Sequence, residues 1–300
     1  MAGSSGFLGS RLRRRLVADG HDIVQLVRRE PQAPDQRRWW PDRGELDPAH
    51  VAGADAVVNL AGAGVEDRRW TRAYKELLWS SRVEPTTTLA RALADLPEAR
   101  RPRTMLQASG IHHYGDRGDE PIDENTPPGT GYFPELCQAW EGATAAADEA
   151  GVRVVYLRTG LPLDARGGLL RPFMITFRLF VGGRLASGRQ WMPWISMRDW
   201  LSATTFLLSR DDIAGPVNCV GPAPVRNTDF TRALAKVLRR PAITPVPRFA
   251  LRAVLGEFAD EAVASLRALP GVLNRAGFSY HDPDVESALR AAVRQREAGP

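Results

Sequence analysis

The sequence predicts an α/β protein built on a doubly wound parallel sheet, with a small, mostly helical C-terminal region. Three observations favour this class. A glycine-rich turn opens the chain and leads into an amphipathic helix and an apolar strand. Strand-like and helix-like segments then alternate, which is typical of parallel sheets. Beyond Leu161 this alternation loosens. We expect a main domain over residues 1–240 and a small one over residues 245–291.

The opening turn carries a glycine at every third position, followed by a helical pattern over Leu8–Val17 and a strand over His21–Val27. Glycines let a backbone approach a pyrophosphate closely, and a helix N-terminus supplies free N–H groups and a positive dipole end. An ordinary tight strand-to-helix turn is the alternative. We predict a dinucleotide site formed by Gly3, Ser4, Ser5, Gly6, Phe7, Leu8 and Gly9.

A strand of about five residues should precede such a turn. Here the sequence starts at Met1, almost inside the turn. We therefore expect the natural protein to carry further apolar residues before Met1.

The end of the second strand carries two arginines, and Arg28 stands nineteen residues after Gly9. In dinucleotide folds an acidic residue near this position binds the ribose 2′-hydroxyl, whereas arginine suits a 2′-phosphate. Arg28 and Arg29 therefore favour NADP(H) over NAD(H). A solvated surface arginine is the alternative.

The middle of the chain continues the alternation. Small residues after the strand that begins at Asp55 leave room for a ligand at the sheet edge. The expected segments are a strand over Asp55–Gly62, a helix over Trp70–Leu96 interrupted at Pro85, a strand over Thr104–Ser109, a helix over Pro134–Ala150 and a strand over Val152–Arg158.

The later part of the chain contains an aromatic loop, Gly188–Ile195, with Trp191 and Trp194. Such a loop suits a lid over an apolar substrate, although both tryptophans could equally be core residues. The other expected segments are helices over Leu169–Phe180, Asp199–Leu208 and Thr228–Leu238, the last capped by Asn227, a strand over Gly215–Val220, a linker over Pro241–Pro247 and a mostly helical tail over Phe249–Arg290.

Composition bounds the class of protein. The 300 residues are 43% hydrophobic and 25% charged, which is ordinary for a globular protein. The net charge is +5, but the arginines are scattered among 35 acids, so we expect no nucleic-acid partner. Cys137 and Cys219 form no disulfide framework, and no apolar run reaches membrane-spanning length. We expect a cytoplasmic monomer or homodimer with a small-molecule substrate, no membrane partner and no metal site.

Several motifs together resemble the extended short-chain dehydrogenases/reductases. They are the Gly3–Gly9 turn, Asn59-Leu-Ala-Gly62, Ser109, Tyr114-Gly115 and Leu157-Arg158-Thr-Gly160. Segments such as Arg69-Trp70 through Ser81-Arg82, Leu136–Glu141 and Leu269–Phe278 resemble an epimerase-family branch similar to the human family 39U proteins, sometimes labelled cell-division-inhibitor-like. That branch carries a C-terminal domain of unknown function, which residues 245–291 resemble.

The resemblance implies a Rossmann-type core that binds NADP(H), with substrate elements in the C-terminal third. It implies cofactor contacts at Leu60, Ala61, Gly62, Arg82, Ser109, Arg158, Thr159, Gly160 and Leu161, and substrate contacts at Gly64, Trp191 and Trp194.

The chain departs from the wider superfamily at its acid–base pair. Those enzymes use Tyr-x-x-x-Lys, whereas none of the five tyrosines here has a lysine four residues later. By position, Cys137 and Glu141 stand in its place and share one helical face. We expect the apolar surroundings beside Trp140 to keep Glu141 partly protonated near neutral pH. An ion-paired Glu141 and a core Cys137 are the alternative. The candidate catalytic residues are Ser109, Tyr114, Cys137 and Glu141.

Two classes of function remain open. The first is an NADP(H)-dependent oxidoreductase or epimerase acting on a small carbonyl or hydroxyl compound, with Ser109 polarising the carbonyl. The second is a protein that binds NADP(H) without turnover and serves as a sensor or scaffold.

Overall fold

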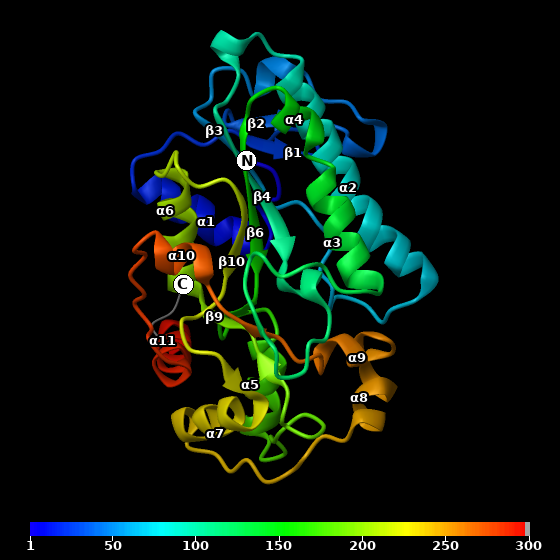
Figure 1. Cartoon of the computed structure of the whole chain (residues 1–300), viewed down its shortest axis with the longest axis vertical. Coiled ribbons are helices and arrows are strands. Elements are labelled where there is room, and N and C mark those ends of the chain that lie inside the picture. The colour runs from blue at the N-terminus through cyan, green and yellow to red at the C-terminus, as the bar shows by residue number, and fades with distance from the viewer. Residues whose placement is uncertain (298–300) are drawn as a thin grey trace.

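A computed structural model describes residues 1–297 and confirms a Rossmann-type α/β fold (Figure 1). The central strands are all parallel and lie in the order β10-β6-β4-β3. A second parallel pair, β1-β2, lies in the same sheet. The strands are β1 (Gln25–Val27), β2 (Gln36–Arg38), β3 (Ala56–Asn59), β4 (Thr104–Gly110), β6 (Arg153–Thr159) and β10 (Gly215–Cys219).

Ala2 joins the two parts of the sheet. Its N–H donates to the Val58 carbonyl (2.9 Å), and its carbonyl accepts from the Leu60 N–H (3.1 Å). On the other side, the Leu26 N–H donates to the Met1 carbonyl (2.9 Å). The first two residues therefore fill the place between β1 and β3 where the sequence led us to expect a whole strand. That the natural chain extends further upstream stays a prediction.

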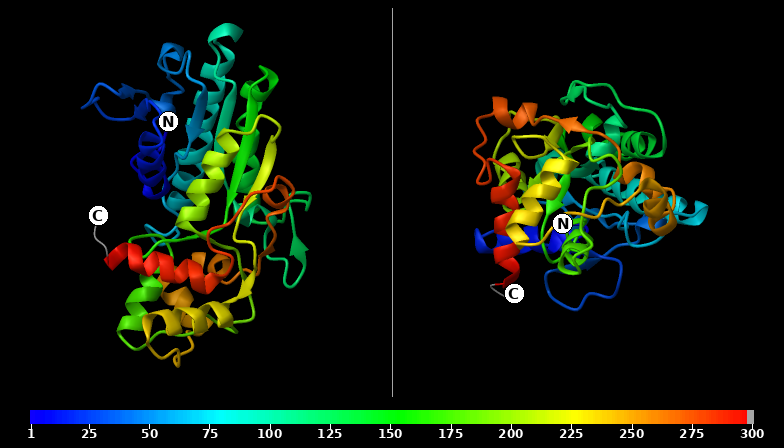
Figure 2. Two further views of the ribbon diagram at one scale, coloured as in Figure 1. Left: turned by 90° about the vertical axis from the view of Figure 1, so that its left-hand side faces the viewer. Right: turned by 90° about the horizontal axis from the view of Figure 1, so that it is seen from below.

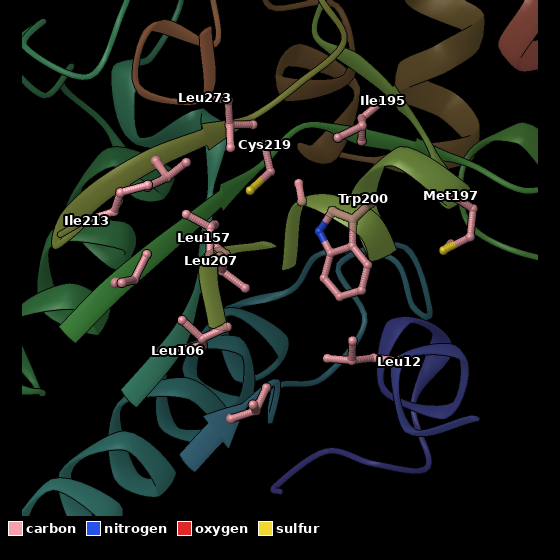
Figure 3. Packing of buried hydrophobic residues seen from close by; sticks show 14 of the residues in the cluster. Leu12, Leu106, Leu157, Ile195, Met197, Trp200, Leu207, Ile213, Cys219 and Leu273 are labelled. Atoms are coloured by element: carbon pink, nitrogen blue, oxygen red, sulfur yellow. The ribbon is translucent and has the colours of Figure 1, made fainter. Parts of the chain in front are cut away.

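Helices cover both faces of the sheet, as a doubly wound fold requires. Neighbouring residues on one strand point to opposite faces, so Leu106 packs with one cluster and Met105 with the other. Figure 3 shows Leu12, Leu106, Leu157, Leu207 and Trp200 within the first cluster, between the sheet and α1 and α6. The covering helices are α1 (Phe7–Ala18), α2 (Arg72–Ala94), α3 (Tyr132–Gly142), α4 (Ala145–Glu149) and α6 (Met197–Leu208).

Helix α2 runs through Pro85, so the expected interruption there is wrong. Proline removes one backbone donor, but Leu78 and Leu89 on either side of it are fully buried. The hydroxyl of Thr86 also donates to the Arg82 carbonyl one turn back (2.8 Å). Burial of the apolar face on both sides therefore outweighs the lost hydrogen bond.

Two further local expectations are wrong. The helix expected over Pro134–Ala150 divides into α3 and α4, where the Thr144 hydroxyl donates to the Glu141 carbonyl (2.8 Å). Asn227 is the first residue of the helix that it was expected to cap. Its side-chain oxygen instead accepts from the Leu185 N–H (2.8 Å), which ties that helix to the preceding loop.

Most elements that follow β6 lie below the carboxyl-terminal end of the sheet in Figure 1, whereas β10 belongs to the sheet and α6 and α10 lie beside it. Small strand pairs connect the C-terminal third, with β7 beside β9, β8 beside β11 and β5 beside β12. Its elements are β7 (Leu161–Leu163), α5 (Leu170–Arg178), β8 (Trp191–Met192), β9 (Trp194–Ser196), β11 (Val225–Arg226), α7 (Asn227–Leu238), α8 (Arg248–Leu255), α9 (Phe258–Ala262), β12 (Arg267–Ala268), α10 (Gly271–Arg275) and α11 (Val285–Glu297); β5 spans Pro121–Ile122, and 3-10 turns lie at Pro41–Arg43, Pro48–His50, Glu98–Arg100 and Ile111–Tyr114.

Buried acids attach the last part of the chain to the core. Glu124 accepts from the backbone N–H groups of Asn218 (3.0 Å) and Val272 (3.1 Å). Asp199, which is fully buried, accepts from the backbone N–H groups of His281 (2.7 Å) and Asp282 (3.1 Å). These contacts cross the boundary between residues 1–240 and 245–291, so that division stays a prediction.

Within residues 1–297, no helix combines the length and the apolar character that crossing a membrane requires. The same residues contain no group of three or more His, Cys, Asp or Glu side chains arranged to hold a metal ion.

Candidate functional site

The glycine turn lies where the order of the strands reverses direction, between β1 and β3. Gly3 has φ 71°, and a Cβ there would lie 2.4 Å from the Leu60 carbonyl oxygen. A Cβ on Gly9 would lie 2.0 Å from the Gly3 carbonyl oxygen. Only glycine fits at these two positions, so the backbone is brought close to the N-terminus of α1. Such a switch point is where ligands of open α/β sheets bind.

Side chains of the turn are fixed by the protein. The buried Ser4 hydroxyl donates to the side-chain oxygen of Gln25 in β1 (2.9 Å). Phe7, the first residue of α1, packs against Gly167 and Gly168, where a Cβ would meet its ring at 2.7 and 3.2 Å. Protein contacts therefore hold both side chains in place.

Arg28 and Arg29 directly follow β1 and are both exposed. Because parallel strands end at one edge of the sheet, these arginines and the glycine turn share that edge. Their guanidinium groups suit a phosphate, which they can contact bidentately.

The segment after β3 closes the same edge. Ala61 donates its N–H to the Asn59 side chain (3.1 Å). Arg82 is buried, and its guanidinium donates to the carbonyls of Ala63 (2.9 Å) and Leu78 (3.0 Å). Arg82 thus holds the loop that contains Gly62 and Gly64, and its charged group is already occupied by backbone oxygens.

The predicted catalytic side chains meet in one buried network. The Ser109 hydroxyl at the end of β4 donates to Glu141 Oε1 (2.6 Å). Arg158 of β6 binds the same carboxylate bidentately, through Nε to Oε1 (2.9 Å) and Nη2 to Oε2 (2.8 Å). Burial disfavours the Arg158 charge, but the bonds to Glu141 outweigh it and raise the pKa of Arg158. Glu141 is therefore an ion-paired carboxylate, which is the alternative that the sequence left open.

Tyr114 extends this network. It accepts from Arg158 Nη1 (2.9 Å) and donates its hydroxyl proton to Asn218 Oδ1 (2.8 Å). Burial raises the pKa of Tyr114 to about 12, although Arg158 partly offsets it. At neutral pH Tyr114 is a protonated phenol with no free hydrogen-bonding position toward a base.

Cys137 lies on α3 beside Gly110, with Sγ 3.6 Å from the Gly110 carbonyl oxygen. Burial, and secondarily the charge of Glu141, raises the pKa of this thiol to about 12. The thiol is thus protonated and poorly nucleophilic at neutral pH.

Sequence reasoning missed two members of the site, Asn218 and His113. Asn218 comes from β10 and is fully buried. His113 is buried with Nδ1 3.9 Å from Glu141 Oε2, and burial lowers its pKa to about 4. No sequence motif identifies either residue, because the groups that they contact in the site are far away in the sequence: Tyr114 for Asn218 and Glu141 for His113.

The remaining predicted residues have structural contacts. Thr159 accepts from the Trp200 indole N–H (3.1 Å), and a Cβ on Gly160 would meet the Pro193 carbonyl oxygen at 2.0 Å. Leu161 pairs with β9. Trp194 is buried and donates its indole N–H to the Ala223 carbonyl (2.9 Å), so it is a core residue.

Trp191 differs from Trp194 in being half-buried. Its indole N–H donates to Asp119 (2.9 Å), and the guanidinium groups of Arg226 and Arg267 lie 4.6 and 4.9 Å from the centre of its ring. These contacts hold the Trp191 ring between protein side chains, those of Asp119, Arg226 and Arg267.

Comparison with known proteins agrees with this architecture. Residues 1–220 match the NAD dependent epimerase/dehydratase family, and residues 246–292 match a domain of unknown function. An epimerase family protein from Mycobacterium bovis is 43% identical over 98% of this chain and 96% of its own length. The human epimerase family protein SDR39U1 is 31% identical over 98% of each chain.

Solved structures give the same result. The crystal structure of human SDR39U1 (isoform 2) with NADPH superposes with a TM-score of 0.89 at 28% identity, over 98% of both chains. A nucleoside-diphosphate sugar epimerase from Corynebacterium glutamicum has a TM-score of 0.78 at 33% identity, over 99% of this chain and 60% of that protein. With its glycine turn at the strand switch, the chain belongs to the NAD dependent epimerase/dehydratase family, in the branch of the SDR39U1 proteins.

Proposed function

We propose that the protein binds NADP(H) at the glycine turn and is an oxidoreductase or epimerase for a small carbonyl or hydroxyl compound. The tight glycine turn supports this most directly, because a side chain at Gly3 or Gly9 would collide with neighbouring backbone, so these glycines let the turn close at the N-terminus of α1, where a pyrophosphate would bind. The human relative crystallised with NADPH supports the same cofactor.

Each part of this edge has a role in the proposal. Residues 3–9 and the N-terminus of α1 hold the pyrophosphate, and Arg28 and Arg29 hold the 2′-phosphate. The segment 60–62 and residues 158–161 line the same edge. When bound, the nicotinamide supplies or accepts a hydride.

Ser109 is the group we assign to proton transfer. Its hydroxyl proton is already donated to Glu141, so its oxygen presents lone pairs. It can accept a proton from a substrate hydroxyl while passing its own to Glu141 Oε1, whose charge Arg158 balances. Polarising a carbonyl, the role expected from sequence, requires the hydroxyl to turn away from Glu141.

The non-catalytic sensor or scaffold remains a second proposal, and one observation favours it. Ser109, Glu141, Arg158 and Tyr114 satisfy one another's hydrogen bonds, as a purely structural network would. Cytoplasmic location and a monomeric or homodimeric state are likewise proposals.

Two measurements separate these functions. Mass spectrometry of ligands that co-purify with the protein would identify cofactor and substrate class. NADPH absorbance would then be followed with that substrate for the wild type and for Ser109→Ala. Turnover that falls by roughly 10²–10⁴ in the variant, at unchanged NADPH affinity, supports the enzyme. Tight NADPH binding without turnover supports the sensor or scaffold.

A further inference from the structure

A cationic cavity lies far from the glycine turn, between the ends of α5, α7 and α11. Its volume is about 490 Å³. None of the described residues that line it is an acid. Glu286 lies nearby and pairs with Lys236 (2.9 Å) and with Arg290. The cationic residues of its lining are Arg178, Arg239, Arg240, Arg290 and Arg294.

Large apolar side chains stand exposed beside these arginines. Leu179, Phe180 and Val181 follow α5 directly and are 66%, 56% and 49% exposed. Ile243, in the segment between α7 and α8, is 74% exposed. The guanidinium of Arg240 lies 4.9 Å from the centre of the Phe180 ring, so the cationic and apolar groups are contiguous.

Backbone contacts fix these segments to each other. A Cβ on Gly183 would lie 1.8 Å from the Thr244 carbonyl oxygen, and Val246 exchanges hydrogen bonds with Arg184 and Ala186 (both 2.9 Å). Both segments lie at the lower end of the long axis, near α5 and α7 (Figures 1 and 2). Their exposed apolar residues therefore belong to one end of the molecule.

Phe180 stands at a strained position, with φ 62°. This φ strains a non-glycine residue, and the residue held there is a large aromatic one that is 56% exposed.

We propose that this end of the protein, defined by Leu179, Phe180, Val181, Ile243 and the five arginines, docks on the surface of an anionic phospholipid membrane. Guanidinium groups match phosphate oxygens, and protruding apolar side chains match hydrocarbon. A phospholipid bilayer is the surface that presents both together, whereas a nucleic acid offers phosphates without hydrocarbon. Such contact is peripheral and needs no spanning helix, so this proposal departs from the expectation of no membrane partner, which is untested.

Vesicle sedimentation tests the docking. The full chain at low salt is mixed with phosphatidylcholine vesicles or with mixed phosphatidylcholine–phosphatidylglycerol vesicles. We expect binding to the anionic vesicles alone, and weaker binding as salt rises. An Arg239→Glu/Arg240→Glu double variant should bind at least roughly thirtyfold more weakly, since each lost cation reduces binding.

The matched control is Arg91→Glu/Arg100→Glu. Both arginines are exposed, and Arg91 lies in the last turn of α2 much as Arg239 lies at the C-cap of α7, so the change in charge near a helix C-terminus is comparable. This control should bind like the wild type. Equal loss in both double variants would show a general charge effect and overturn the proposal.

Phe180→Gly separates binding from folding. Glycine relieves the positive φ, so thermal stability should stay at or above that of the wild type. Membrane affinity should fall by about tenfold, because the aromatic ring is lost. Unchanged affinity of Phe180→Gly, or a wild-type protein that stays in the supernatant when the anionic vesicles are sedimented, would refute the docking. Binding to a fluorescent duplex oligonucleotide but not to vesicles would assign the face to nucleic acid instead.

Discussion

The glycine turn and the Ser109–Glu141–Arg158 network lie at the same edge of the sheet but are built in opposite ways. At the turn, no side chain caps the N-terminus of α1, and Arg28 and Arg29 beside it are exposed. In the network, hydroxyl, carboxylate and guanidinium groups bond to one another and are buried. The turn is suited to receiving a ligand, whereas the network must give up an existing bond to engage one.

This difference separates binding from chemistry. A dinucleotide can occupy the turn without disturbing the core, because its phosphates need only backbone N–H groups and surface arginines. Proton transfer at Ser109 has to pass through an ion pair that also stabilises the fold. The largest effects on stability should therefore come from the network, and the clearest effects on cofactor affinity from the turn.

Glu141→Gln should produce the largest effect on stability. Removing the carboxylate charge leaves the Arg158 guanidinium buried and uncompensated, which costs about 3–5 kcal/mol of the free energy of unfolding. Urea unfolding measures this. The matched control is Glu76→Gln, because Glu76 pairs with Arg72 at the surface, where such a pair is worth about 0.5 kcal/mol or less. A Glu141→Gln protein within about 1 kcal/mol of the wild type would contradict a structural role for the pair.

His113 should make the same region sensitive to acid. Its folded pKa of about 4 lies below the unfolded value of 6.5, so the neutral form stabilises the fold fully above pH 6.5. As pH falls from 6.5 to 4, the unfolded state gains a proton first, and stability drops by up to about 3 kcal/mol. Urea unfolding across this range would show a shallower drop for His113→Gln. His21, which is exposed, serves as the surface control when changed in the same way.

Arg28→Ala tests the turn rather than the network. Losing a charge-assisted contact to the 2′-phosphate should weaken NADPH binding by about ten- to a hundredfold, or roughly 1.5–3 kcal/mol, with NADH affinity and fold stability unchanged. Fluorescence titration of both cofactors measures this, and Arg29→Ala ranks the two arginines. If the wild type bound NADPH and NADH with equal affinity, neither arginine would recognise the 2′-phosphate.

Cys137 should give the smallest effect. With its pKa raised to about 12, the thiol is protonated, so iodoacetamide should leave it unmodified at neutral pH unless the protein unfolds. Mass spectrometry of labelled native and denatured protein would detect the difference. Rapid labelling in the native state would contradict a protonated, buried thiol and would make Cys137 a candidate for proton transfer again.

The order of elements and the place of the glycine turn could be predicted, because both depend on local spacing. Glycines three apart and an arginine after the second strand identify one edge of the sheet without any long-range information. The states of Glu141 and Tyr114 could not, because they depend on Arg158 and Asn218, which come from other strands. The same limit explains Trp194, whose burial depends on residues near Ala223 that no spacing relates to it. Pro85 shows that burial of the residues before and after a proline can keep a helix continuous although proline disfavours helix.

The contacts of Glu124 and Asp199 have a consequence for synthesis on the ribosome. Glu124 bonds to the N–H of Val272, and Asp199 bonds to the N–H groups of His281 and Asp282. While residues 269–282 are still inside the exit tunnel, a nascent chain already carrying the whole parallel sheet would hold both acids without these C-terminal partners, although Glu124 could still accept from the Asn218 N–H and Asp199 from the Ser196 hydroxyl. Vectorial folding of this protein should therefore pause with its sheet assembled and complete only when that short stretch emerges, which makes the interval a natural point for chaperone engagement.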